Sequence, residues 1–236
     1  MAALIARLRA HGPEGLWFLL LSLLITWPMA ASPTRVVVGH EEATAACHVW
    51  VLWWAQMHLG DPQTDLIFHP HGADVVTLYG SDVLSPVLLA ASPLPPVLTF
   101  NLWVVTLLLL GGFGGRAFGR ALGAGRWGAL AGGTVFLAAP FFQHELLNGT
   151  TELLAAAALP WFAAVLWRLL ETPTRRLGLA LGLVTALGTL ASAYNAFFLL
   201  VVGLCLFLHR VSTTPGPVIT REHWLHGLTG VGLSAA

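Results

Sequence analysis

The longest apolar run in the chain covers residues 177–208 and is almost unbroken. As a single helix it would be about 48 Å long, whereas the hydrocarbon core of a membrane is only about 30 Å thick. The run is therefore too long for one membrane-spanning helix and fits two short ones. The segment Ser192-Ala193-Tyr194-Asn195 lies at its middle and predicts a tight hairpin turn between them.

The composition places the whole chain in the same class of protein. Of its 236 residues, 56% are hydrophobic and 9% are charged, whereas a soluble domain carries about 25% charged residues. The formal net charge is zero, so no electrostatic argument for binding nucleic acid arises. We therefore predict an all-α, polytopic membrane protein without a nucleic-acid partner.

Six apolar segments are predicted to span the membrane, and the polar stretch 32–94 is predicted to form one long external loop. Within this loop, Trp50, Trp53 and Trp54 indicate a helix that lies in the membrane interface, where tryptophan is favoured. Residues 1–210 would form one transmembrane domain. Residues 211–236 would form a cytoplasmic segment and the start of a truncated further span. The six predicted spans are residues 15–31, 97–111, 127–142, 153–170, 177–192 and 195–208.

The arginines predict the orientation of this layout. The chain has 11 basic residues, and all of them except Arg35 fall on the side of the N-terminus. Positively charged residues are enriched in cytoplasmic loops. The N-terminus is therefore predicted to be cytoplasmic and the 32–94 loop to lie outside.

The stretch 39–82 concentrates acidic and imidazole side chains in an otherwise apolar chain. Glu41 and Glu42 follow the first predicted span closely. A carboxylate at this level could act as a general base or bind a divalent cation. The alternative is a solvated first turn, in which acidic residues complement the helix dipole.

A second cluster consists of His69-Pro70-His71 and Asp74. Its side chains could contact a substrate phosphate or could simply belong to the architecture of the loop. Two imidazoles and a carboxylate could also hold Zn²⁺, but no second pair of ligands has a spacing typical of zinc sites, so no residue is assigned as a metal ligand. Asn195, in the predicted hairpin, could touch a ligand, with a plain turn as the alternative.

The order of these features resembles the GT-C superfamily of membrane glycosyltransferases, near its bacterial mannosyltransferase-like and YfhO-like branch. The resemblance covers most of residues 1–210, and no single motif in it is diagnostic. The stretches that carry it are His40-Glu41-Glu42, the Trp-rich segment His48–Trp54, Phe68-His69-Pro70-His71-Gly72, Phe100-Asn101-Leu102, Arg116–Arg120, Ala139-Pro140-Phe141, Gly149–Glu152 and Leu159-Pro160.

This resemblance implies transfer of a sugar from a polyprenyl-phosphate donor on the external face of a bacterial inner membrane. Its partners would be the lipid-linked donor and membrane lipid, and a divalent cation could take part. The family acid in the first external loop, usually Asp, would be Glu41 or Glu42. The implied substrate-binding residues are His40, His69, His71, Asp74 and Asn195. The alternative is a non-catalytic membrane protein: a transporter or flippase subunit, or an inactive remnant.

Single cysteines introduced by substitution can test the predicted topology. We expect Cys at Pro62 or Asn148 to react with an impermeant thiol reagent from outside, and Cys at Phe118 or Thr174 to react only from the cytoplasm. Labelling of the Pro62 and Phe118 positions from the same side would contradict the layout.

Overall fold

Helices dominate the fold. A computed structural model of the chain describes residues 2–40, 44–58, 61, 63–75 and 82–214. It is about 75% helical with almost no strand, which confirms the predicted helical class. The elements are α1 (Ala2–Ile25), η1 (Met29–Ala31), α2 (Ala45–Met57), β1 (Gln63–Thr64), β2 (Ala73–Asp74), α4 (Leu84–Ala90), α5 (Pro96–Ala121), α6 (Arg126–Leu137), α7 (Pro140–Asn148), α8 (Thr151–Leu154), η2 (Ala155–Ala157), α9 (Ala158–Glu171), α10 (Arg175–Ala191) and α11 (Ala193–Thr213).

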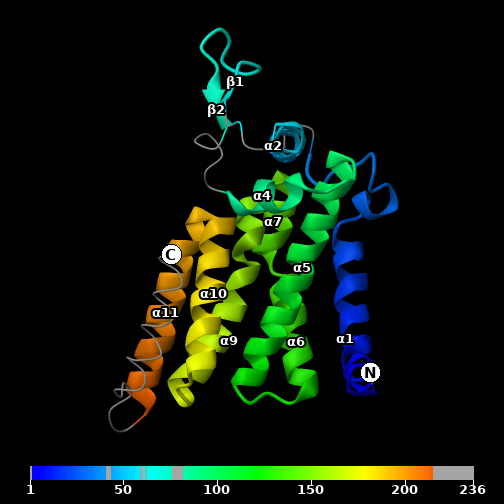
Figure 1. Cartoon of the computed structure of the whole chain (residues 1–236). Coiled ribbons are helices and arrows are strands. Elements are labelled where there is room, and N and C mark those ends of the chain that lie inside the picture. The colour runs from blue at the N-terminus through cyan, green and yellow to red at the C-terminus, as the bar shows by residue number, and fades with distance from the viewer. Residues whose placement is uncertain (1, 41–43, 59–60, 62, 76–81, 215–236) are drawn as a thin grey trace.

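The longer helices form one bundle, with the short elements gathered at one of its ends. In Figure 1, α1, α5, α6, α9, α10 and α11 run side by side, whereas α2 is seen end-on above them. The antiparallel β1–β2 hairpin projects beyond α2. We call this the α2 end of the bundle. All the short elements of the 32–94 stretch lie at the α2 end.

Three helical stretches are long and apolar enough to cross a membrane: Pro96–Ala121, Thr151–Glu171 and Ala193–Thr213. A shorter apolar helical stretch covers Gly12–Ile25. The outward face of α11 carries exposed leucines, as expected of a helix that meets lipid. These helices indicate a membrane-embedded protein, while the number of six spans and the external position of the loop stay predictions.

Several helix ends differ from those expected from the sequence. α1 ends at Ile25 and not at Ala31, because Pro28 has no N–H to continue the helix. The next expected span, 97–111, continues to Ala121 as α5, into the stretch that separates the predicted spans 97–111 and 127–142. The expected hairpin turn falls at Ser192, the extended residue between α10 and α11.

Glycine explains why α5 continues through a Gly-rich segment. A Cβ on Gly115 would lie 3.0 Å from the Cα of Gly133 in α6, and a Cβ on Gly114 would lie 2.8 Å from Pro160 in α9. Small residues let the backbones of membrane helices approach closely. The segment therefore forms the packing surface of a helix, where its composition alone predicted a loop.

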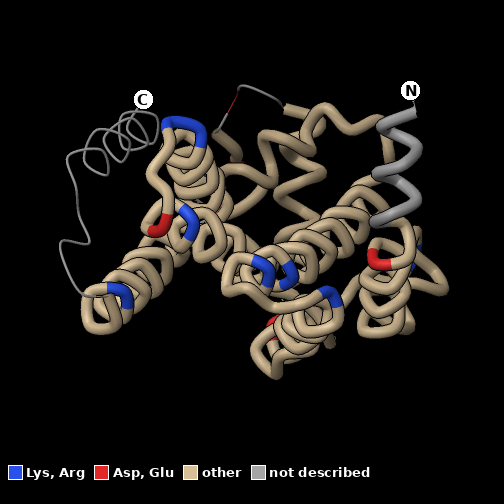
Figure 2. Tube along the Cα trace, turned by 90° about the horizontal axis from the view of Figure 1, so that it is seen from below, with Lys and Arg blue, Asp and Glu red and all other residues tan. Residues whose placement is uncertain are grey.

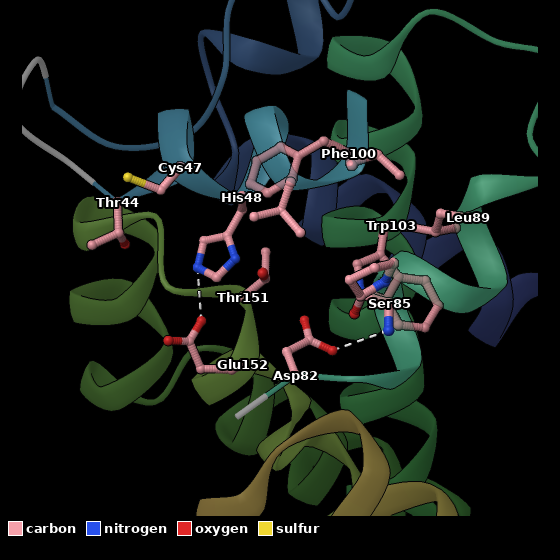
Figure 3. Close-up of a pocket in the computed structure, with 13 residues that line it drawn as sticks. Thr44, Cys47, His48, Asp82, Ser85, Leu89, Phe100, Trp103, Thr151 and Glu152 are labelled. Carbon is pink, nitrogen blue, oxygen red and sulfur yellow. Dashed lines mark hydrogen bonds and ion pairs between the residues drawn. The ribbon is translucent and has the colours of Figure 1, made fainter. Parts of the chain in front are cut away.

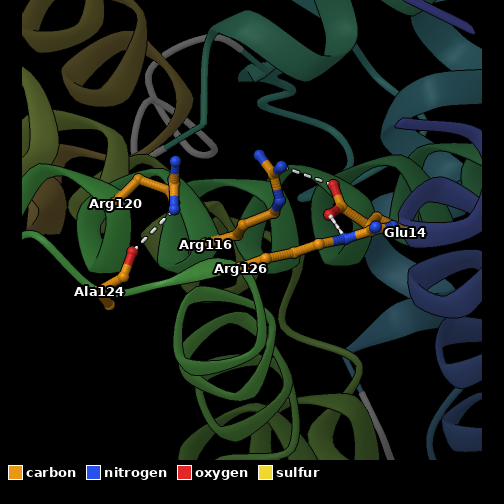
Figure 4. A network of polar contacts seen from close by, with 5 residues as sticks. All are labelled: Glu14, Arg116, Arg120, Ala124 and Arg126. Carbon is orange, nitrogen blue, oxygen red and sulfur yellow. Dashed lines mark hydrogen bonds and ion pairs between the residues drawn. The ribbon is translucent and has the colours of Figure 1, made fainter. Parts of the chain in front are cut away.

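The bundle end opposite α2 carries the arginines. Figure 2, viewed from that end, shows arginine positions at the ends of several helices. There the buried Glu14 of α1 binds two of them, with its carboxylate oxygens 2.6 Å from Nη2 of Arg116 and 3.1 Å from Nε of Arg126 (Figure 4). The ion pairs compensate the burial of Glu14 and join α1 to α5 and α6. We call this the arginine end.

The close packing of α5 against α6 can be tested with two glycine substitutions in α6, one of which serves as the control. A Cβ at Gly133 would meet the Gly112 carbonyl and lie 2.7 Å from Cζ of Phe18, whereas one at Gly128 would meet only the Cβ of Ala124, at 3.4 Å. We expect Gly133→Ala to destabilise the protein by about 1–3 kcal/mol through overpacking. Gly128→Ala should be neutral or stabilising by up to about 1 kcal/mol. Thermal unfolding in detergent measures both, and equal midpoints would contradict the packing.

Candidate functional site

A cavity of about 180 Å³ lies beneath α2 at the α2 end. It is enclosed by α2, α4, the start of α5 and α8 (Figure 3). One wall is apolar and includes Leu52, Leu89, Phe100 and Trp103. The other lining residues carry titratable and hydroxyl groups, among them His48, Asp82, Ser85, Thr151 and Glu152. Convergent polar groups in a largely apolar cavity are the usual form of a binding or active site.

The contact between His48 and Glu152 joins α2 to α8. Nε2 of His48 lies 2.7 Å from Oε2 of Glu152, and the two side chains are only 15% and 16% exposed. On its other side, the imidazole stacks on Phe100, with ring centroids 6.4 Å apart. The carboxylate and the aromatic ring together fix the orientation of the imidazole.

The turn between α7 and α8 sets the position of this pair. Gly149 has a φ of 67°, in the left-handed region that glycine adopts without strain, and a Cβ there would lie 2.5 Å from that of Ala45. Thr44, at the start of α2, donates from both its N–H and its hydroxyl to the carbonyl of Asn148, at 2.9 and 2.8 Å. The beginning of α2 is thereby attached to the residues just before Glu152.

Asp82 is the second carboxyl group of the cavity, and Figure 3 shows it between the His48–Glu152 pair and Ser85. It is only 6% exposed, and its Oδ1 accepts a hydrogen bond of 3.0 Å from the N–H of Ser85. Burial raises the pKa of this carboxyl, and the bond from Ser85 offsets only part of the increase. A carboxylate whose pKa is raised is a stronger base than an ordinary aspartate, which favours abstraction of a proton.

The residues predicted from the sequence lie elsewhere or outside the described part of the chain. Glu41 and Glu42 are outside the described residues. His40 is exposed, and its N–H donates to the carbonyl of Leu147 at 3.2 Å. Asn195 is buried, and its Nδ2 donates to the carbonyls of Ala155 and Gly188 at 3.1 and 3.0 Å. These contacts join α11 to η2 and α10 and place Asn195 in the helix packing.

The predicted cluster of His69, His71 and Asp74 belongs to the β1–β2 hairpin. Both histidines are exposed, and Oδ2 of Asp74 accepts a bond of 3.2 Å from Gln63 across the hairpin. His71 lines a separate, open cavity of about 450 Å³ with His58, Asp65 and other residues. Among the described lining residues of the His48 cavity, none comes from this cluster.

The three titratable residues that the fold brings together, His48, Asp82 and Glu152, were not among the site residues predicted from the sequence. His48 and Asp82 lie within the polar stretch 39–82, but no spacing rule links them. Glu152 lies 70 residues or more from both. Two signals pointed to it: the Gly149–Glu152 stretch belongs to the resemblance, and the stretch lies between the predicted spans 127–142 and 153–170, where Asn148 was predicted to be outside. Across the parts of the chain that the structure describes, no group of three or more His, Cys, Asp or Glu side chains is arranged to hold a metal ion.

Comparison with known proteins gives no match: no family model, no curated protein and no solved structure matches the chain. The resemblance to the GT-C superfamily therefore stays a prediction that depends on the sequence stretches quoted above.

The buried Asp82 predicts how stability depends on pH. The pKa of Asp82 is raised above the ordinary aspartate value of 3.8, so the folded protein binds this proton more tightly than the unfolded chain does. The folded protein therefore loses stability as the pH rises from 3.8 through the raised pKa. Asp82→Asn removes this ionisation and keeps an oxygen for the Ser85 N–H. We expect the variant to unfold a few degrees above the parent at alkaline pH, and the difference to vanish below pH 3.8.

Thermal unfolding across pH checks this, with the exposed Asp61→Asn as a control that should show no such difference. A variant less stable than the parent at alkaline pH would show that the surroundings favour the ionised form of Asp82.

Proposed function

We propose that this chain is a glycosyltransferase-like membrane protein that transfers a sugar from a polyprenyl-phosphate donor to a hydroxyl acceptor. One observation carries the proposal: the fold gathers His48, Asp82 and Glu152 from three separate segments into one cavity. The sequence resemblance points to the same kind of reaction. Carboxyl and imidazole groups at this spacing supply a base and a hydrogen-bond donor without requiring a nucleophile from the protein.

Each group has a role in the proposed step. The acceptor oxygen attacks the anomeric carbon of the donor while the bond from that carbon to the phosphate oxygen breaks. The phosphate leaves with the bonding electron pair, and Asp82 takes the proton of the acceptor hydroxyl. His48 donates a hydrogen bond to the leaving phosphate, and the carboxylate of Glu152 keeps its imidazole in position.

The distribution of charge supports the proposed location of the reaction. The described arginines of the long helices lie at the arginine end, which we place in the cytoplasm of a bacterium. The cavity at the α2 end then lies at the external surface of the inner membrane. A polyprenyl phosphate keeps its tail in lipid and its phosphate at the membrane surface, which is the level of the cavity.

Glu41, Glu42, His69 and His71 stay predicted contributors in this proposal. A divalent cation between a carboxylate and the donor phosphate also stays a proposal. Asp82 is the base that we favour, because its burial in the cavity is accompanied by a raised pKa.

Release of polyprenyl phosphate by the purified chain in lipid nanodiscs tests the proposal. We would supply radiolabelled polyprenyl-phosphate mannose or glucose and follow transfer of the sugar to water or to an added hydroxyl acceptor. Asp82→Asn should lower the rate by about 100-fold or more, since general base catalysis contributes about 10²–10⁴. His48→Gln should lower it as well, because the leaving phosphate loses a donor.

The control is Asp61→Asn, which removes an exposed carboxylate outside the cavity and should leave the rate unchanged. Rates that are equal in the parent and in Asp82→Asn would contradict the role of Asp82. A parent that releases no polyprenyl phosphate would contradict transfer itself and favour the non-catalytic alternative.

A further inference from the structure

The charge of the cavity restricts what it can bind. Two of its described lining residues, Asp82 and Glu152, are carboxylic acids. His48 is the one described lining residue that can carry positive charge, and it already lies 2.7 Å from Glu152. The described lining therefore sets two carboxyl groups against one group that can be cationic, and the attraction of His48 offsets only part of the effect of burial on Asp82. An anion placed beside it would meet repulsion in a partly water-excluded site.

The shape of the lining restricts the ligand further. Phe100 and Trp103 come from the start of α5, and Leu89 comes from α4, so that one wall is aromatic and aliphatic. The other lining residues bring carboxylate oxygens, which accept hydrogen bonds, and hydroxyl groups, which both donate and accept. Such a cavity fits a molecule with C–H groups on one face and several hydroxyl groups on the other.

We infer that this cavity binds a neutral, polyhydroxylated ligand of the saccharide class and discriminates against anionic ones through Asp82. That this ligand is the sugar acceptor rests on the proposed function. That the cavity binds it does not depend on the proposed function. The carboxylate of Asp82 accepts a hydrogen bond from a ligand hydroxyl, and the aromatic wall covers a C–H face. The donor phosphate then stays at the edge of the cavity, on the side of His48.

Cys47 provides a measurement of binding that does not depend on activity. It lines the cavity and is exposed, as is Cys205 on α11, and these are the two cysteines of the chain. In a Cys205→Ala variant, the rate of alkylation by N-ethylmaleimide reports on the surroundings of Cys47 alone. A ligand in the cavity slows this rate. A Cys47→Ala variant, in which Cys205 reacts, shows whether the ligand affects the reagent itself.

The probes are methyl glucoside and its anionic counterpart, methyl glucuronoside, added to protein in lipid nanodiscs free of glycoside detergent. We expect methyl glucoside to protect Cys47 from alkylation. The glucuronoside should require about a tenfold higher concentration for the same protection, because about 1.4 kcal/mol of repulsion corresponds to a tenfold weaker affinity. In Asp82→Asn the ratio should fall to about two or three, because the repelling charge is gone. Cys205 should react at the same rate with and without either probe.

A second variant separates occupation of the cavity from other effects. Leu89→Trp places a larger side chain in the apolar wall and should abolish protection by both probes. Equal protection by the neutral and anionic probes in the parent would overturn the inference, as would absence of protection by methyl glucoside. A chain that binds methyl glucoside but transfers no sugar would refute the proposed function and leave this inference standing.

Discussion

The close contact of α5 with α6 and α9 holds the other elements in position. Gly115 faces Gly133 across the first interface, and Gly114 faces Pro160 and Trp161 across the second. The indole N–H of Trp161 donates to the carbonyl of Leu110 in α5 at 2.8 Å. Because the first residues of α5 also form the apolar wall of the cavity, the geometry of the site depends on how this helix is packed. Small residues along α5 are therefore needed both to pack the bundle and to position the wall of the cavity.

Side-chain hydrogen bonds to backbone carbonyls fix the chain at the α2 end. Asn101 is buried at the start of α5, and its Nδ2 donates to the carbonyls of Pro33 and Val36, both at 2.7 Å. Gln56, near the end of α2, donates to the carbonyls of Ser92 and Leu94 at 3.3 Å. Buried or half-buried carbonyls outside helices need such partners. These bonds attach both the segment before α2 and the end of α2 to the bundle.

The two carboxyl groups of the cavity differ in their surroundings. Glu152 lies against an imidazole, whereas the buried Asp82 accepts a hydrogen bond from the backbone N–H of Ser85. Acidic groups in unlike environments are typical of sites in which one group transfers a proton and another orients a partner. At the arginine end, by contrast, Glu14 is bound by two arginines, which is the arrangement of a structural ion pair. The same residue type thus lies in different surroundings at the two ends.

The helical class and the positions of most long helices followed from the sequence alone, because apolar run length and the distribution of arginine depend only on local composition. The run 177–208 predicted two helices with a turn near Ser192, and the structure has α10 and α11 there. The continuation of α5 to Ala121 was not predictable, since a Gly-rich segment forms a helix only when neighbours pack against it.

The cavity likewise depended on tertiary structure. His48 could be recognised as part of a Trp-rich helix, and Asp82 as one acid among several, but neither position indicated a partner. Their approach to Glu152 requires the left-handed turn at Gly149 and the hydrogen bonds of Thr44 to Asn148. The sequence by itself determined that charged and imidazole side chains gather at the ends of the bundle, because lipid excludes them from the spans. Only the packing of α2 on α5 and α8 decided which of those residues face one another.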